Sequence, residues 1–172
     1  RLPQVTQPII RRTRTERNLD AGGLVAEVVA NHVLAVDDEE GILLLLTRIL
    51  ESTGYAVETA ADAHDAMRRV SEHVPAVVLS DMQMPGPSGL WLAEQLRERS
   101  PATAVVLVTA EAPLGPDMPG GVIGCVSKPI DPDEVRNAVA QAYAWWSGRS
   151  GLPIPELHPK GRPARPPSRV GQ

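Results

Sequence analysis

Short apolar runs alternate with amphipathic segments through the middle of the chain, from residue 32 to residue 147. The apolar runs are five or six residues long and rich in valine, which is typical of strands buried in a sheet. They lie at 32–36, 55–60, 76–80, 103–108 and 122–126. The segments between them space their apolar residues as helices do, and predict helices over 41–54, 62–73, 89–99 and 131–146.

Residues that start or stop helices support these limits. Gly54 is a stop signal for the first helix. Asp62 stands at the start of the second, with Asp65 three positions on as in an acidic capping box, and Pro75 is expected to end that element. The last helix begins with Asp131 as its N-cap and proline at the first helical position.

Strands interleaved with helices imply a single α/β domain with a parallel five-stranded sheet and right-handed crossovers. The segment 111–121, EAPLGPDMPGG, stands between the last two strands and is too rich in proline and glycine for an ordinary helix, so we expect an irregular or shortened fourth helix. We predict a linker or arm at 1–31, the domain at 32–147, and a disordered tail rich in proline and arginine at 148–172.

The distribution of charge and the composition exclude several classes of protein. Residues 32–147 contain 17 acidic and 7 basic residues, a net charge of −10, which argues against direct binding of nucleic acid by this domain. No stretch approaches the roughly 18 to 20 apolar residues that cross a bilayer, so we expect no direct contact with a membrane. Cys125 is the only cysteine, which excludes an intrachain disulfide and favours a cytoplasmic location.

Polar residues follow four of the predicted strands, at the ends where parallel α/β sheets place their chemistry. These residues are Asp37 and Asp38, Asp81, Thr109, and Lys128. Three neighbouring carboxylates repel one another unless a cation lies among them, and a cluster of oxygen ligands suits Mg²⁺. A lysine and a hydroxyl beside them would bind the oxygens of a phosphoryl group, so the pattern predicts phosphoryl transfer.

Four segments in fixed order carry a resemblance to a known family: VLAVDDEE, VVLSDMQMPGPSG, VLVTA and SKPI. Over about residues 32–147 they resemble the signature segments of response-regulator receiver domains, the CheY-like domains of two-component signal transduction. The resemblance implies a flavodoxin-like (βα)5 fold with a doubly wound sheet. It also implies a phospho-acceptor protein that is not an enzyme beyond its own phosphorylation and dephosphorylation.

The resemblance assigns roles to individual residues. Asp81 matches the aspartate that receives the phosphoryl group, and Thr109 and Lys128 match the residues that bind the phosphoryl oxygens. The Mg²⁺ ligands would be Asp38 directly and Asp37 chiefly through water.

Asp81 and the backbone carbonyl of Gln83 would complete the Mg²⁺ site. Pro85 and Gly89 match the bend that follows the third strand.

The partner implied by the family is a histidine kinase or a histidine phosphotransfer protein, and a homodimer is a further expectation. The opening RLPQV resembles the end of a histidine-kinase ATP-binding domain, so the chain is expected to be either the C-terminal receiver of a hybrid kinase or a stand-alone regulator. Two other functions stay open at this point. One is a pseudo-receiver that only binds proteins, and the other is a haloacid-dehalogenase-like phosphohydrolase. The phosphohydrolase needs a second acid where Gln83 stands.

One position departs from the family pattern. Receivers usually carry Tyr or Phe three residues before the signature lysine, and here that residue is Cys125. We therefore predict that phosphorylation is retained while the aromatic switch is absent or rewired. Amide exchange with and without beryllofluoride tests this, and the protection changes of ordinary receivers across that face would contradict it.

Overall fold

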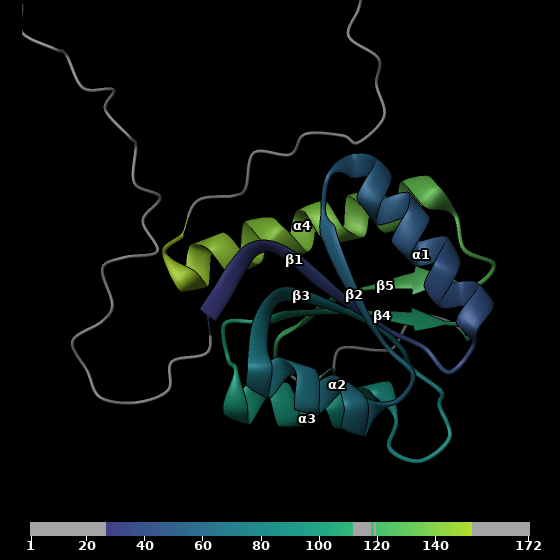
Figure 1. Ribbon diagram of the computed structural model, residues 1–172, viewed down its shortest axis with the longest axis horizontal. Coiled ribbons are helices and arrows are strands. Elements are labelled where there is room, and N and C mark those ends of the chain that lie inside the picture. Colours follow the sequence, from purple (N-terminus) through teal and green to yellow (C-terminus); the bar gives the residue numbers. More distant parts are fainter. Residues whose placement is uncertain (1–26, 112–117, 119, 153–172) are drawn as a thin grey trace, which may run out of the picture.

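The computed structural model describes residues 27–111, 118 and 120–152, with side chains from residue 31 onward. Among the described residues, strands and helices alternate along the chain except between the last two strands (Figure 1). The strands are β1 (Glu27–Val36), β2 (Ala56–Ala60), β3 (His73–Asp81), β4 (Ala104–Thr109) and β5 (Val122–Ser127). The helices are α1 (Glu40–Thr53), α2 (Ala63–Glu72), α3 (Gly89–Arg99) and α4 (Pro132–Ser150).

The five strands form one parallel sheet in the order β2-β1-β3-β4-β5. Helices α1 and α4 cover one face of the sheet, and α2 and α3 cover the other (Figure 1). The strand order reverses beside β1, and a doubly wound sheet carries its functional site outside the strand ends near such a reversal. The predicted fold class is therefore confirmed.

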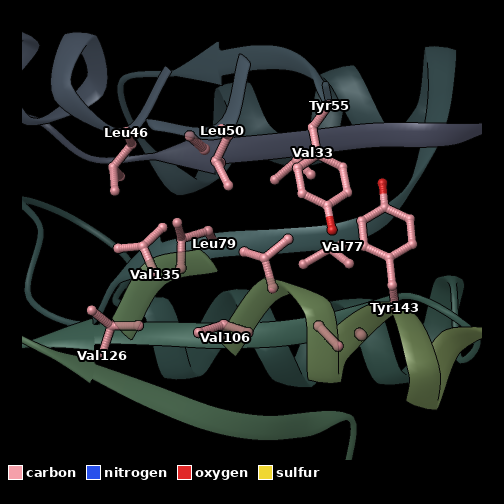
Figure 2. Close-up of a cluster of buried hydrophobic side chains, with 14 of the residues drawn as sticks. Val33, Leu46, Leu50, Tyr55, Val77, Leu79, Val106, Val126, Val135 and Tyr143 are labelled. Atoms are coloured by element: carbon pink, nitrogen blue, oxygen red, sulfur yellow. The ribbon is translucent and has the colours of Figure 1, made fainter. Parts of the chain in front are cut away.

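The valine-rich strands provide a core on each face, because alternate residues of a strand point to opposite sides of the sheet. Val33 and Ala35 face α1 and α4, whereas Leu34 and Val36 face α2 and α3. In the first core the rings of Tyr55 and Tyr143 stack with their centroids 4.9 Å apart, and Figure 2 shows them side by side among valine and leucine side chains. These buried layers fix the strand ends against one another.

The predicted limits of two strands were wrong. β1 begins at Glu27 instead of residue 32. β3 begins at His73 instead of residue 76, so Pro75 lies inside this strand. The preceding helix, α2, already ends at Glu72, before the proline. At their N-terminal ends β1 and β3 pair with each other through Val29 and Pro75. This pairing lies before the point at which β3 begins to pair with β4. The proline is tolerated because no strand pairs with it on the β4 side, where its carbonyl accepts a hydrogen bond of 2.9 Å from the Thr103 hydroxyl.

The predicted helix ends are confirmed by their geometry. Gly54 has φ 108°, and its N–H bonds to carbonyls of the last turn of α1. The carboxylate of Asp62 accepts a hydrogen bond of 2.8 Å from the Asp65 N–H, and that of Asp131 accepts from two N–H groups of α4. The side chain of Asp65 does not complete a capping box, since it pairs instead with Arg68 and Arg69.

The expected irregular fourth helix falls mostly on residues 112–117 and 119, which lie outside the described part of the chain. The residues between β4 and β5 that the structure describes form no helix. The last helix extends to Ser150, three residues beyond the predicted domain limit. The division into 1–31, 32–147 and 148–172 stays a prediction. Within the described ranges, no helix has the length and apolar character that crossing a membrane requires.

Candidate functional site

The carboxyl ends of four neighbouring strands hold the predicted site residues. Asp37 directly follows β1, and Asp81 is the last residue of β3. Thr109 is the last residue of β4, and Lys128 directly follows β5. Because these strands are parallel neighbours in the sheet, their carboxyl ends lie along one edge and the four side chains gather there.

The acidic residues form a compact cluster. Each of Asp37, Asp38 and Asp81 offers a carboxylate oxygen, and these oxygens lie within 4.8 Å of one another. Asp37 is fully buried and Asp81 is 6% exposed, whereas Asp38 is exposed. The carboxylate of Asp38 thus reaches solvent, whereas those of Asp37 and Asp81 are buried.

Lys128 places its ammonium group between the two buried carboxylates. Its Nζ lies 3.3 Å from Asp81 Oδ1 and 3.4 Å from Asp37 Oδ2. The backbone fixes its position, because the Lys128 N–H donates a hydrogen bond of 2.8 Å to the carbonyl of Thr109. The ammonium group therefore balances part of the negative charge.

Burial and the neighbouring charges shift the pKa values of Asp37 and Lys128. Burial raises the pKa of Asp37, with a contribution from Asp81, although a hydrogen bond from the Glu39 N–H and the charge of Lys128 act against the rise. Burial would lower the pKa of Lys128, but the attraction of Asp37 and Asp81 outweighs it, so the pKa is raised. The site thus favours the charged form of Lys128 and disfavours the ionised form of the buried Asp37 carboxylate.

The loop after Asp81 turns back sharply against the strand. The Gly89 N–H donates a hydrogen bond of 3.0 Å to the carbonyl of Met82, and the Ser88 hydroxyl caps α3 by accepting from the Trp91 N–H. A Cβ added at Gly89 would lie 2.3 Å from the carbonyl oxygen of Asp81. Only glycine fits this contact, which explains why the predicted bend needs it.

The rim of the site contains a residue that sequence reasoning did not single out. Glu111 Oε1 accepts a hydrogen bond of 2.8 Å from Gln83 Nε2, and the Glu111 N–H donates one of 3.0 Å to Thr109 Oγ1. The side chain of Gln83 is thereby held outside the cluster. The sequence feature that could have pointed to Glu111 is its position, two residues after the strand-end residue Thr109.

The donor set fits a magnesium ion. The ligand atoms are carboxylate oxygens, the chemistry that Mg²⁺ prefers, and the exposure of Asp38 leaves room for the water molecules that this ion retains. Asp37, Asp38 and Asp81 are therefore the side chains that would hold the ion.

Cys125 lies on β5, three residues before Lys128. It is partly buried and packs against the core on the side of α2 and α3. The expectation that the aromatic switch is absent or rewired here stays a prediction.

Comparisons with known proteins agree with this geometry. The response regulator receiver domain matches residues 33–140. Response regulator Rre1 of Synechocystis is 38% identical over 122 residues, which cover 65% of this chain and 53% of that protein. Sporulation initiation phosphotransferase F of Bacillus subtilis is 32% identical over 110 residues, which cover 62% of this chain and 89% of that protein.

Solved structures show the same fold. Chemotaxis response regulator CheY4 of Vibrio cholerae gives a TM-score of 0.60 at 29% identity, covering 64% of this chain and 97% of that one. Response regulator TrrA of Thermotoga maritima, solved in complex with Mg(2+)-BeF, gives the same TM-score, identity and coverage: 0.60, 29%, and 64% and 97%.

The chain belongs to the response regulator receiver domain family. It functions as a receiver domain, the part of a response regulator that is phosphorylated by a kinase. It spans about half the length of Rre1 and about a quarter of the Escherichia coli regulator GlrR, 53% and 26% respectively. The pseudo-receiver and phosphohydrolase alternatives are not favoured by these matches.

Proposed function

We propose that Asp81 is the residue that accepts the phosphoryl group. The observation that carries the proposal is the contact of a nearly buried carboxylate with a single ammonium group, 3.3 Å from Asp81 Oδ1 to Lys128 Nζ, at a strand end beside two further carboxylates. A carboxylate oxygen in this setting can act as a nucleophile, and the ammonium group of Lys128 places a positive charge where incoming phosphoryl oxygens would bind.

In the proposed reaction a carboxylate oxygen of Asp81 attacks the phosphorus of the donor. The donor is the phosphohistidine of a histidine kinase or phosphotransfer protein, or a small acyl phosphate such as acetyl phosphate. A bond forms between the oxygen and phosphorus, and the bond from phosphorus to the donor nitrogen or oxygen breaks. The product is an aspartyl acyl phosphate, which water later hydrolyses to restore the carboxylate.

The other residues position the transferred group. The ammonium group of Lys128 and the hydroxyl of Thr109 would bind phosphoryl oxygens, since Lys128 Nζ contacts Asp81 Oδ1 and Thr109 ends the neighbouring strand β4. Mg²⁺ bound by Asp37, Asp38, Asp81 and the backbone carbonyl of Gln83 would spread the negative charge that develops on the phosphoryl oxygens. Gly89 keeps the loop close to the Asp81 carbonyl and so holds the acceptor in place.

The histidine-containing partner is proposed to dock on the first half of α1. Leu44 and Leu45 are 52% and 38% exposed, and they are the large apolar side chains that the described surface leaves open. They stand one turn beyond the N-terminus of α1, which begins two residues after Asp38. Exposed leucines beside a reactive site mark a surface for a protein partner.

The proposal extends to the location, the assembly and the remaining chemistry of the domain. The family and the single cysteine in the chain support a cytoplasmic location. A homodimer and a place in either a hybrid kinase or a stand-alone regulator are both compatible with a receiver domain. Slow autodephosphorylation is proposed as the only chemistry that the domain catalyses after its own phosphorylation.

Incubation with acetyl phosphate and Mg²⁺, followed by intact mass measurement, tests the proposal. The wild-type chain is expected to gain about 80 Da, the mass of one phosphoryl group. Asp81→Asn should not gain it, whereas Asp133→Asn, which changes an 87% exposed carboxylate on α4, should gain it as the wild type does. An unmodified wild type, or a modified Asp81→Asn, would overturn the assignment.

A further inference from the structure

A pocket lies at the opposite end of the sheet from Asp81. Its volume is about 210 Å³. It is formed by α3, the C-terminal half of α4, the start of β4, and the residues just before β5. In Figure 1 this end lies away from the arrowheads of β4 and β5. The residues used below are Arg97, Thr103, Gly120, Gly121, Trp145 and Arg149.

The pocket carries positive charge that the described residues do not neutralise. Arg97 and Arg149 both line it, both are exposed, and neither forms an ion pair with a described residue. The described lining contains no acidic residue. This is unusual in a domain whose net charge over residues 32–147 is −10.

The two guanidinium groups keep their hydrogen-bond donors available. The Arg149 guanidinium carbon lies 4.9 Å from the ring centroid of Trp145, a cation–π contact that uses the charge and not the N–H groups. No hydrogen bond from Arg97 to a described residue is present. Guanidinium groups with free N–H donors bind carboxylate and phosphate oxygens in pairs.

The rest of the lining is apolar or aromatic. The hydroxyl of Thr103 is committed, since it donates to the Pro75 carbonyl at 2.9 Å and pairs with the Ser100 hydroxyl at 2.8 Å. Ala93, Pro101 and Val105 supply aliphatic surface, and Trp145 supplies a ring. Gly120 and Gly121 complete the lining without side chains of their own.

We propose that this pocket binds a small oxyanion, a carboxylate or phosphate joined to a compact apolar or aromatic group. The oxyanion would pair with Arg97 and Arg149, and the apolar group would pack on Trp145 and the aliphatic floor. The volume is below the roughly 300 Å³ at which drug-sized pockets begin, which limits the ligand to a small molecule. The site is independent of phosphoryl transfer at Asp81.

The test is a titration of the whole chain in Mg²⁺-free buffer with inorganic phosphate, phenyl phosphate and phenylacetate, followed by tryptophan fluorescence and amide NMR shifts. Phenyl phosphate or phenylacetate should saturate a site whose shifts centre on Arg97, Gly121 and Trp145. The comparison of the two separates phosphate from carboxylate as the preferred anion. Inorganic phosphate should bind more weakly because it lacks the apolar group.

Two variants locate the site. Arg97→Gln and Arg149→Gln should each raise the dissociation constant about tenfold, the loss expected for one charge-assisted hydrogen bond. Arg99→Gln removes an equal charge from an exposed position of α3 outside the pocket. This variant should change the dissociation constant less than about twofold. Unchanged phosphorylation of each variant by acetyl phosphate shows that it is folded. The proposal is overturned by a lack of saturation up to about 10 mM, by equal affinities in all variants, or by shifts confined to Thr109 and Lys128.

Discussion

Lys128 Nζ lies 3.3 Å from Asp81 Oδ1, and the same nitrogen lies 3.4 Å from the fully buried carboxylate of Asp37. One ammonium group therefore serves two carboxylates that repel each other. This relationship couples the proposed acceptor to the stability of the domain, because the charge that prepares Asp81 for reaction also permits the burial of Asp37.

Replacing the lysine should reveal this coupling. Lys128→Gln is expected to lower the free energy of unfolding in Mg²⁺-free buffer at pH 7.5 by about 1–3 kcal/mol, because buried carboxylates lose their charged partner. The pKa of Asp37 is raised in the folded state, so its ionised form costs stability, and that cost disappears as pH falls through the folded pKa. Urea denaturation at a series of pH values below 7.5 should therefore show a deficit that shrinks as Asp37 becomes protonated.

Arg136→Gln is the control for this change, since its guanidinium pairs with an exposed carboxylate on α4. It should alter stability by less than about 1 kcal/mol. A Lys128→Gln variant as stable as the wild type at pH 7.5 would contradict the account.

The contact of Gly89 with the acceptor strand predicts a second effect. Gly89→Ala would bring a Cβ to 2.3 Å from the carbonyl oxygen of Asp81, so either α3 or the acceptor must move. We expect a loss of about 1–3 kcal/mol in the free energy of unfolding, together with slower phosphorylation by acetyl phosphate. Chemical denaturation and the rate of mass gain measure the two effects.

Gly148 provides the matched control, because it lies inside α4 and a Cβ there would meet nothing within 4 Å. Gly148→Ala should stabilise the domain by roughly 0.5–1 kcal/mol through the higher helix propensity of alanine. If both alanine variants behaved alike, the close approach at Gly89 would have no energetic significance.

His32 on β1 predicts a dependence of stability on pH. Its Nε2 lies 3.1 Å from a carboxylate oxygen of Glu58, while its Nδ1 is buried with no hydrogen-bond partner among the described residues. Burial lowers the pKa of His32, with a further contribution from His73 and an opposing one from Glu58. Protonation would place a second N–H, without an acceptor, in an apolar environment.

The sign of this effect follows from linkage. The unfolded chain takes up a proton near pH 6.5, whereas folded His32 stays neutral to a lower pH, so its contribution to stability is lost as pH falls below about 6.5. The free energy of unfolding of the wild type, relative to His32→Gln, should therefore decrease between pH 7.5 and 5.5. A difference that does not vary over this range would contradict the burial of neutral His32.

The docking proposal for α1 predicts a separation of two reactions. Leu44→Ser and Leu45→Ser together should leave phosphorylation by acetyl phosphate unchanged, because the leucines are exposed and lie outside the acidic cluster. Transfer from the histidine kinase that phosphorylates the wild type fastest in a purified panel should fall about tenfold or more. Ala140→Ser, at an exposed position of α4, is the control, and equal kinase transfer in both variants would rule out this docking surface.

The sequence was sufficient to predict the sheet and the members of the site because both follow from local pattern. Valine-rich runs define the strands, and polar residues at their ends meet wherever such strands are parallel. The extra length of β1 and β3 could not be predicted, since the pairing of Val29 with Pro75 depends on where β4 begins. A proline is compatible with a strand only where its neighbour on one side is missing.

Contacts between distant segments were also beyond prediction. The charge network that links His32, Glu58 and Arg69 depends on the register of β1 against β2 and on the packing of α2. The pair of arginines at the opposite end of the sheet comes together only through the placement of α3 and α4. Gln83 was predicted to contribute a backbone carbonyl, but its side-chain partner Glu111 lies 28 positions away.

The identity of the phosphorylated residue is tested most directly by locating the acyl phosphate. Borohydride reduction converts an aspartyl phosphate to homoserine, and trypsin should release residues 70–97 as one peptide in which Asp81 is the only aspartate. The account predicts homoserine at position 81 of this peptide after treatment with acetyl phosphate and Mg²⁺, and none without Mg²⁺. Homoserine in peptide 18–48, which contains Asp37 and Asp38, with none at position 81 would contradict it.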